Sequence, residues 1–365
     1  MDGNAPEASS EHGRSELPAD VPVSIVLCVL NEQRHIATAV RHALDQDHLG
    51  PLELVIALGP SKDRTDEIVA ELAAADPRIR SVRNPSPTGS TPAGLNAAIA
   101  VTRHPVVVRI DGHALLPREY IRIAVETMRE TGADNVGGIM AAEGVSPFEQ
   151  AVARAMTSRL GVGNASFHTG GEPGPADTVY LGVFRRSALE RVGGYDETFL
   201  RAQDWEMNLR IRRSGGLVWF QPALKVSYRP RSTVRALGRQ YFHYGRWRRV
   251  VMRRHEGTVN FRYLAPPVAL GGVVAGLGLV AVGGATRSAL PAWIGSVLPA
   301  GYATAVVVGS AVESRGLPLR VRIWVPLATA TMHLFWGAGF LSSPRRLATP
   351  RSRITSVVGT ATPSS

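Results

Sequence analysis

The 365-residue sequence contains one cysteine, Cys28, so a disulfide within the chain is impossible. Disulfides persist mainly in oxidising compartments, and this composition therefore fits a main domain in a reducing one. Residues 1–21 are polar and lack the apolar stretch of a signal peptide. We expect 1–21 to be a disordered leader and the domain that follows it to stay in the cytoplasm.

Two common nucleotide-binding patterns are absent as well. The sequence has no G-x-G-x-x-G pattern and no Walker loop, which argues against a dinucleotide-dependent dehydrogenase and a P-loop NTPase. Acidic residues are also in the minority: the sequence contains 30 Asp and Glu and 41 Lys and Arg, which gives a net charge of +11. This balance favours partners that carry phosphate, such as nucleic acid, anionic lipid or a phosphorylated substrate.

Short apolar runs alternate with helical segments in the first part of the chain. The runs typical of buried strands are 23–30, 52–58, 79–82 and 105–110. The alternation predicts an α/β domain over 22–228 with a doubly wound, mostly parallel sheet. Ligands of such sheets bind at the carboxyl ends of the strands, where polar loops beginning at Asn31, Gly59 and Asp111 should converge.

A basic segment follows this domain. Residues 229–254 carry nine arginines and no acidic residue. At helical spacing, one face is formed by arginines and the opposite face by aromatic and aliphatic residues. The arginine face consists of Arg235, Arg239, Arg246, Arg249 and Arg253. We interpret 229–260 as an amphipathic helix on anionic lipid, and the alternative is a solvated helix packed on the domain by its aromatic stripe.

Three long uncharged runs occupy 261–344. They contain 24 residues before Arg287, 25 residues between Arg287 and Glu313, and 22 residues before Arg345. Each is long enough to cross a bilayer core of about 30 Å, although buried core helices are the alternative. The sequence therefore predicts about three hydrophobic segments in a multi-pass protein of the cell membrane.

The segment 345–365 is a basic and polar tail. Three spans that start inside would place this tail outside, whereas basic segments prefer the cytoplasm. One segment is therefore expected to be re-entrant, and the third, with Pro326 and His333, is the candidate.

Asp111 and His113 end an apolar strand, so their side chains should point into the crevice. An aspartate and a histidine two positions apart can bind one divalent cation, which would bridge two phosphates and neutralise a departing diphosphate. A histidine ligand favours Mn²⁺ over Mg²⁺. The alternative is a turn aspartate beside a surface histidine.

Two further constellations stand at the starts of helices. Asp204, after Gln203, could take a proton from an attacking hydroxyl, or could simply be a favourable first-turn residue. Ser61 and Asp63 belong to a strand–loop–helix junction whose free N–H groups can hold phosphate or ribose. Asp63 by itself would equally serve as the N-cap of the next helix.

Read in order, these pieces resemble glycosyltransferase family 2, which has the GT-A fold. The resemblance covers roughly 22–255 and rests on VSIVLCVLNE, GPSKDRTDEI, RNPSPTGSTPAGLNAAI, RIDGHALLP, GVFRRSALERVGGYDE and AQDWEMNLRIRRSG. The D-x-H form, the QYFHYGRWRR segment and the trailing hydrophobic runs look most like the succinoglycan-biosynthesis glucosyltransferase subgroup. The chain departs from the family at Leu58 and Gly59, where many members have acidic residues, and at Gln203, where glutamate is common.

The resemblance implies a role for each matching residue. Residues that would contact the nucleotide sugar are Asn31, Glu32, Ser61, Asp63, Asn96 and Asp111. Asp111 would also bind a divalent metal, Mn²⁺ or Mg²⁺, with His113 as second ligand. Asp204 would be the general base of a direct displacement with inversion. The residues that would contact the acceptor or diphosphate are Gln203, Gln240, Arg246 and Trp247, the last three resembling a Q-x-x-R-W element with wider spacing.

The sequence thus predicts an inverting glycosyltransferase with a nucleotide-sugar donor and a lipid-linked or membrane-proximal acceptor, acting in the synthesis of cell-surface polysaccharide or glycolipid. Anionic membrane lipid is an expected partner, and nucleic acid is not. A different class of function is a catalytically inactive scaffold of a membrane polysaccharide-assembly complex. A processive synthase with an export channel is a third hypothesis, and three hydrophobic segments are few for a channel.

Overall fold

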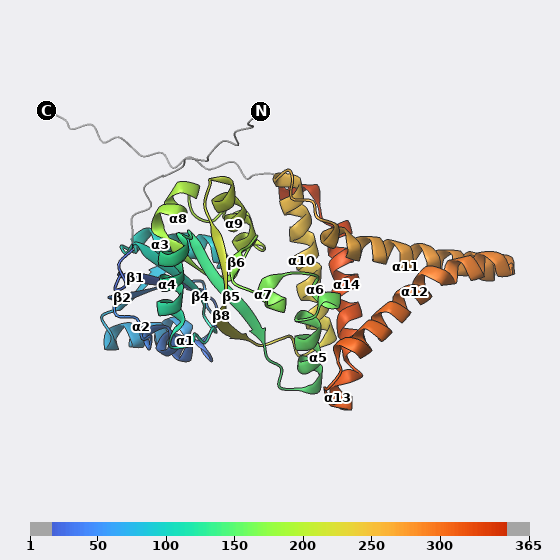
Figure 1. Cartoon of the computed structure of the whole chain (residues 1–365), viewed down its shortest axis with the longest axis horizontal. Helices are drawn as coiled ribbons and strands as arrows, with labels where there is room; N and C mark the ends of the chain where they lie inside the picture. The colour runs from blue at the N-terminus through green and yellow to red at the C-terminus, as the bar shows by residue number, and fades with distance from the viewer. Residues whose placement is uncertain (1–16, 349–365) are drawn as a thin grey trace, which may run out of the picture.

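The computed structural model describes residues 17–348. Most of the predicted leader, residues 1–16, and most of the predicted tail, residues 349–365, lie outside this part of the chain. The described residues form an α/β domain and a group of long C-terminal helices (Figure 1).

The first half of the α/β domain alternates strictly between strands and helices. In chain order these are β1 (Val23–Val29), α1 (Ile36–Leu44), β2 (Leu52–Leu58), α2 (Thr65–Ala75), β3 (Ile79–Arg83), α3 (Thr91–Val101) and β4 (Val106–Asp111). The four strands pair in parallel in the order β3-β2-β1-β4. Each predicted apolar run is therefore a strand of one parallel sheet.

The second half extends this sheet with antiparallel pairs and with one parallel pair, β5 with β8. Its elements are α4 (Tyr120–Thr131), β5 (Asn135–Ala142), α5 (Pro147–Met156), α6 (Arg159–Val162), α7 (Ser166–Thr169), β6 (Gly174–Pro175), β7 (Tyr180–Arg185), α8 (Arg186–Val192), α9 (Gln203–Arg213) and β8 (Val218–Tyr228). The full order is β3-β2-β1-β4-β7-β5-β8-β6, and β7 runs antiparallel to both β4 and β5. The mostly parallel α/β fold confirms the predicted fold class.

Both faces of the sheet are covered, which explains why the strands are apolar throughout. Along β1, Ile25 and Leu27 belong to one core, and Val26 belongs to the other. Alternate strand residues point to opposite faces, so a strand buried on both sides needs a continuous apolar run. Helices α1, α2 and α4 contribute to the first core, and α3, α8 and α9 contribute to the second.

The C-terminal region is helical. It consists of α10 (Val234–Arg254), α11 (Phe261–Thr286), α12 (Ala289–Glu313), α13 (Leu319–Arg322), α14 (Val325–Leu341) and the 3₁₀ turn η1 (Arg345–Ala348). Helix α14 packs along α10 and against α5, whereas α11 and α12 pack on each other and project from the molecule as a hairpin (Figure 1).

The three uncharged runs have different environments. Within residues 17–348, α11 and α12 are the helices long and apolar enough to cross a membrane, and most of their residues are exposed. The third run forms α14, which has 17 residues and buries, among others, Val325, Met332 and Phe340. Its apolar character serves packing on α10 and α5, because protein side chains cover it.

Helix α10 uses its aromatic face for packing. Leu237, Tyr241, Trp247 and Val251 are buried, whereas Tyr244 stays 40% exposed. Its glycines permit close approach to α14, because a Cβ at Gly245 would meet the backbone of Trp336. The aromatic stripe therefore packs on protein, as in the alternative interpretation of this segment, and contact between its arginine face and lipid stays a prediction.

Candidate active site

A buried arginine connects the two aspartates that the sequence singled out. Arg109 lies on β4 and is 5% exposed. Its Nη2 atom is 2.8 Å from Asp111 Oδ1 at the end of the same strand, and its Nη1 atom is 3.5 Å from Asp204 Oδ2 in the first turn of α9. Asp111 and Asp204 therefore share one guanidinium at the carboxyl edge of the sheet, the edge where ligands of such folds bind.

Sequence reasoning missed Arg109. A charged residue in the middle of the apolar run VVVRID was the available signal, because a buried charge needs a partner. Burial by itself would lower the pKa of Arg109, but Asp111 and Asp204 raise that pKa overall. The guanidinium is therefore a fixed positive charge between two carboxylates.

The carboxyl group of Asp204 is accessible to solvent and has a shifted pKa. Its side chain is 36% exposed. Desolvation raises the pKa of its carboxyl, the charge of Arg109 opposes this effect, and the charge of Asp111 adds to it, with a net upward shift. A carboxylate with a raised pKa accepts a proton more readily than an ordinary one, so the site suits a general base.

The second predicted metal ligand faces a different carboxylate. His113 Nδ1 lies 3.0 Å from Glu32 Oε1, to which it donates a hydrogen bond. This bond raises the pKa of His113. Gly112, which precedes His113, allows its loop to lie close to Val29 and Glu32. A Cβ at this position would lie 2.8 Å from Val29 Cγ1 and 3.2 Å from Glu32 Cγ. The loops after β1 and β4 thus meet through Glu32 and His113.

Three predicted donor-binding residues fasten the loop after β1 to the loop after β2. Ser61 Oγ accepts from Asn31 N at 3.1 Å, and Asn31 Oδ1 accepts from Lys62 N at 2.8 Å. Asp63 Oδ2 accepts from Gln33 N at 3.2 Å. Asn31 has a left-handed backbone with φ 57°, which asparagine tolerates better than most residues. These side chains set the shape of the loop that carries Glu32.

Asn96 on α3 fixes the segment that leads into α9. Its Nδ2 atom donates to the carbonyl of Tyr195 at 2.8 Å, and its Oδ1 atom accepts from Tyr195 N at 2.9 Å. A Cβ at Gly194 would lie 2.8 Å from Asn96 Oδ1, so this close contact needs glycine. Asn96 therefore helps to position the chain before Asp204.

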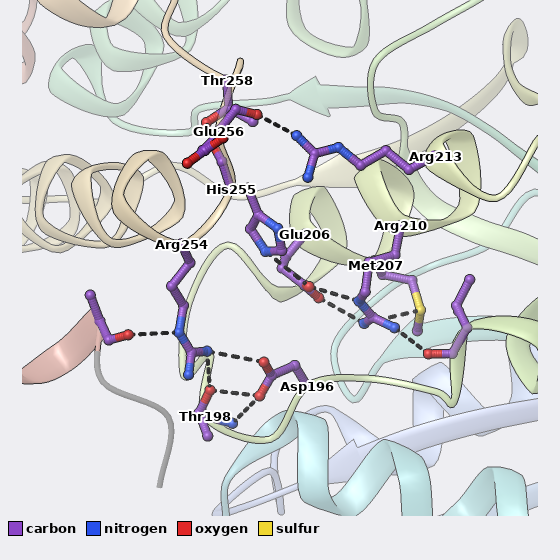
Figure 2. A network of polar contacts seen from close by, with 12 residues as sticks. Asp196, Thr198, Glu206, Met207, Arg210, Arg213, Arg254, His255, Glu256 and Thr258 are labelled. Atoms are coloured by element: carbon purple, nitrogen blue, oxygen red, sulfur yellow. Dashed lines mark hydrogen bonds and ion pairs between the residues drawn. The ribbon is translucent and has the colours of Figure 1, made fainter.

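Helix α9 is also tied to the end of α10, as Figure 2 shows. Glu206 binds Arg210 at 2.7 Å and His255 at 3.2 Å, and Asp196 binds Arg254 at 3.0 Å. Burial opposes ionisation of Glu206, but hydrogen bonds from His255 and Arg210 lower its pKa overall. These contacts hold the helix that carries Asp204 against the C-terminal region.

The remaining predicted residues lie next to α9 or on α10. Gln203 opens α9 and is 9% exposed. Gln240 Nε2 donates to the hydroxyls of Tyr228 and Tyr244, both at 2.8 Å. The guanidinium of Arg246 lies over the ring of Phe242 at 5.3 Å, and Trp247 is 6% exposed in an apolar cluster with Phe199. Their predicted contacts with acceptor or diphosphate stay predictions.

The two predicted metal ligands are accessible side chains at the end of β4. Among residues 17–348, no group of three or more His, Cys, Asp and Glu side chains is arranged to hold a metal ion. Asp111 and His113 are 28% and 51% exposed, respectively, so both remain accessible. Their binding of a divalent cation, whose other ligands would be substrate oxygens and water, stays a prediction.

The sheet order and the strand-end carboxylate describe a GT-A glycosyltransferase. The family model "Glycosyl transferase family 2" matches residues 24–193. Succinoglycan biosynthesis protein ExoA of Rhizobium meliloti (strain 1021) is 33% identical over 324 residues, which are 87% of this chain and 93% of that protein. The chain therefore belongs to glycosyl transferase family 2 and is a glycosyltransferase.

Two more distant proteins are also similar. Dolichyl N-acetyl-alpha-D-glucosaminyl phosphate 3-beta-D-2,3-diacetamido-2,3-dideoxy-beta-D-glucuronosyltransferase of Methanococcus voltae is 24% identical over 255 residues, 67% of this chain and 77% of that one. Mannosyltransferase PcManGT of Pyrobaculum calidifontis, solved with GDP-Man and Mn²⁺, has a TM-score of 0.57 at 18% identity and covers 90% of this chain and 88% of its own. The latter likeness supports the fold.

Proposed function

We propose that the protein is an inverting, metal-assisted glycosyltransferase that transfers a hexose from a nucleotide sugar to a lipid-linked acceptor at the cytoplasmic surface of the cell membrane. The observation that carries this proposal is the pairing of Asp111 and Asp204 through Arg109. One carboxylate would serve the donor and the other the acceptor, and the arginine sets the distance between them.

The proposed reaction is a direct displacement. The acceptor hydroxyl attacks the anomeric carbon while Asp204 takes its proton. A new glycosidic C–O bond forms as the bond from the anomeric carbon to the diphosphate breaks, and the configuration at that carbon inverts. The guanidinium of Arg109 keeps Asp204 oriented and offsets the repulsion between the two carboxylates.

Donor binding is assigned to the loops at the carboxyl ends of β1, β2 and β4. Asn31, Ser61 and Asp63 shape the first two loops through the hydrogen bonds described above. Asp111 and His113 would hold a divalent metal, Mn²⁺ or Mg²⁺, together with diphosphate oxygens, and the bound metal would supply charge neutralisation for the leaving diphosphate. The Pyrobaculum mannosyltransferase was solved in complex with Mn²⁺, which supports this assignment.

The membrane setting is inferred from the hairpin. Helices α11 and α12 expose many large apolar side chains, among them Val268, Leu277, Trp293 and Ile294. A soluble surface rarely exposes so many together, whereas a bilayer favours them. The dolichyl phosphate compound in the name of the Methanococcus relative supports a lipid-linked acceptor. The arginines of α10 would face anionic lipid beside the hairpin.

The test is release of nucleoside diphosphate. The full-length protein in mild detergent is screened against nucleotide sugars with Mn²⁺, with Mg²⁺ and with EDTA, in the presence of lipid extract as acceptor source. Asp204→Asn should lower turnover about 10²-fold to 10⁴-fold, the range for loss of a general base, while donor binding persists. Asp111→Asn should weaken donor binding and metal dependence.

The matched control is Asp45→Asn, because Asp45 is 72% exposed and its ion pair with Arg118 is long at 3.7 Å. This variant should keep the activity of the unaltered protein. Absence of release and of donor binding for every nucleotide sugar would contradict the proposal and favour a scaffold role in a membrane complex.

A further inference from the structure

A second concave region lies between the catalytic domain and the start of the hairpin. It consists of two adjacent cavities of about 420 and 350 Å³ that share Asp177 and Arg212 in their walls. Residues 164–167 and Arg262 at the start of α11 line the first, and Trp205 and Tyr263 line the second. We call this region the junction cavity. Its lining contains none of the residues assigned to donor, metal or base.

Guanidinium groups gather at the junction cavity. Arg212 and Arg213 come from α9, and Arg262 comes from α11. Arg248 of α10 is clamped between two rings of the wall, because its Cζ atom lies 4.3 Å from the ring centroid of Trp205 and 4.2 Å from that of Tyr263. Burial lowers the pKa of Arg248 to about 10, so it remains positively charged at neutral pH.

Only part of this charge is neutralised by the wall itself. Asp177, which is 61% exposed, binds Arg212 Nη1 at 3.2 Å. Arg213 donates to the main-chain carbonyl of Glu256, and Arg262 donates to the carbonyl of Asn164 at 3.2 Å and to the hydroxyl of Tyr263 at 2.6 Å. Those acceptors are neutral, so an excess of positive charge faces the cavity.

Several donors in or beside this wall are buried and have no hydrogen-bond partner among residues 17–348. They are Arg212 Nε, Arg248 Nη1, Arg262 Nε and Trp205 Nε1. Buried donors in proteins are almost always paired, so unpaired donors on the lining residues Arg212, Arg262 and Trp205 point to a ligand with several acceptor oxygens. Phosphate and diphosphate have such oxygens and carry the opposite charge, and the planar guanidinium of arginine can bind two phosphate oxygens at once.

The position of the cavity indicates what carries the phosphate. Its wall includes Arg262 and Tyr263 in the first turn of α11, and the exposed apolar surface of the hairpin begins there with Phe261, which is 83% exposed. A headgroup in the cavity could therefore extend an apolar tail along α11. Arg212 lies eight residues after Asp204 on α9, roughly 12 Å along the helix axis. That separation allows a sugar linked to the phosphate to reach Asp204.

We propose that the junction cavity binds the phosphate or diphosphate headgroup of the polyisoprenyl-linked acceptor. The acceptor identity rests on the function proposed above, whereas the site itself rests on the arginines and their unpaired donors. In this arrangement the lipid headgroup is held by Arg212 and Arg262, with the charge of Arg248 between the rings of Trp205 and Tyr263, and the sugar at the far side of the phosphate reaches the base.

The test measures equilibrium binding of radiolabelled polyprenyl phosphate to the full-length protein in nanodiscs of phosphatidylcholine, without donor. Arg212→Gln combined with Arg262→Gln should weaken binding about 10-fold to 100-fold, the effect of losing charge-assisted hydrogen bonds. The matched control is Arg41→Gln combined with Arg118→Gln, two exposed arginines of the catalytic domain whose loss changes the net charge equally. The control should bind like the unaltered protein.

Competition measurements distinguish the possible sources of the phosphate, and a single variant covers the case in which the double variant does not fold. Inorganic phosphate and vesicles with phosphatidylglycerol should compete at least tenfold less well than polyprenyl phosphate, and equal competition would overturn the assignment to a polyisoprenyl headgroup. Arg213→Gln changes an exposed side chain, so this variant should fold even if the double variant does not. We expect it to weaken the binding of polyprenyl phosphate about threefold. Equal binding by Arg213→Gln, the double variant and the control would overturn the site.

Failure of this site can be distinguished from failure of the proposed function. Asp204→Asn should retain polyprenyl phosphate binding although it is inactive. If no nucleotide sugar is turned over but the arginine variants still lose lipid binding, the proposed headgroup site is supported and the proposed transfer reaction is contradicted.

Discussion

The catalytic domain and the C-terminal hairpin use the same apolar residue types in opposite ways. Ile25 and Leu27 of β1 are completely buried between helices, whereas Val268 of α11 and Trp293 of α12 are 71% and 74% exposed. A continuous apolar run therefore has two outcomes, burial by protein or exposure. The bilayer proposed above for the hairpin would cover this exposed apolar surface.

Helix α14 lies between these extremes and shows what decides the outcome. Its sequence contains no Asp, Glu, Lys or Arg, and α11 and α12 each contain only one, yet α14 fills the space between α10 and α5. Close approach to α10 is possible because small residues meet there, and a Cβ at Gly339 would clash with the backbone of Phe242. Partner geometry, and not composition alone, separates a packed helix from a candidate span.

The largest effect is expected where charge is buried in the catalytic domain. Arg109→Met removes the partner that Asp111 and Asp204 share. Removing one partner of a buried ion pair typically costs about 3–5 kcal/mol, and here two partly exposed carboxylates would lose the charge that offsets their repulsion. Denaturant unfolding in detergent measures this loss. Arg118→Met, at a side chain that is 70% exposed, is the control and should change stability by less than about 0.5 kcal/mol. Equal stability of the two variants would show that Arg109 is not a structural centre.

The next effect compares the two regions directly. Leu27→Ala empties a fully buried site in β1 and should lower the free energy of unfolding by about 2–5 kcal/mol. Leu277→Ala on α11, where the side chain is 54% exposed, should leave the unfolding of the catalytic domain within about 0.5 kcal/mol. A matching loss in both variants would mean that the hairpin side chain is buried by protein.

Most of the fold could be predicted from the sequence, because local patterns determine it. VSIVLCV, LELVIAL and VVVRID are apolar along their whole length, and only a strand covered on both faces requires that. The predicted positions of Asp111 at a strand end and Asp204 at a helix start are also local features. The structure places both where the sequence put them.

The side-chain contacts of the candidate site depend on residues that are distant in the sequence. Arg109 was missed because its second partner, Asp204, is brought close only by the docking of α9. His113 and Glu32 were assigned separate roles, and their hydrogen bond appears only when two loops meet. Asn96 was assigned to the donor, but its contacts with Tyr195 need the folded domain. Side-chain pairing across a fold leaves no pattern in a single sequence.

A smaller effect compares glycines of α10 and α11. A Cβ at Gly245 would overlap the carbonyl of Trp336, so Gly245→Ala should push α14 away from α10 and destabilise the protein by about 1–3 kcal/mol. A Cβ at Gly278 of α11 would meet no atom within 4 Å. Gly278→Ala should therefore stabilise α11 by about 0.5–1 kcal/mol, since alanine favours a helix interior over glycine. Thermal unfolding in detergent measures both shifts, and destabilisation by Gly278→Ala would place a protein neighbour there.

The smallest expected effect is a shift in the pH dependence of the transferase activity. Desolvation and the charge of Asp111 raise the pKa of Asp204 in spite of Arg109. A general base works in its ionised form, so activity should fall as pH decreases through this raised pKa, above the ordinary aspartate value of about 3.9. The profile of kcat/KM with the preferred donor measures that acid limb. Leu277→Ala should leave the limb unchanged, because its side chain lies on the hairpin and carries no charge. An acid limb at the ordinary aspartate pKa, or one that moves with Leu277→Ala, would contradict the assignment of the base to Asp204.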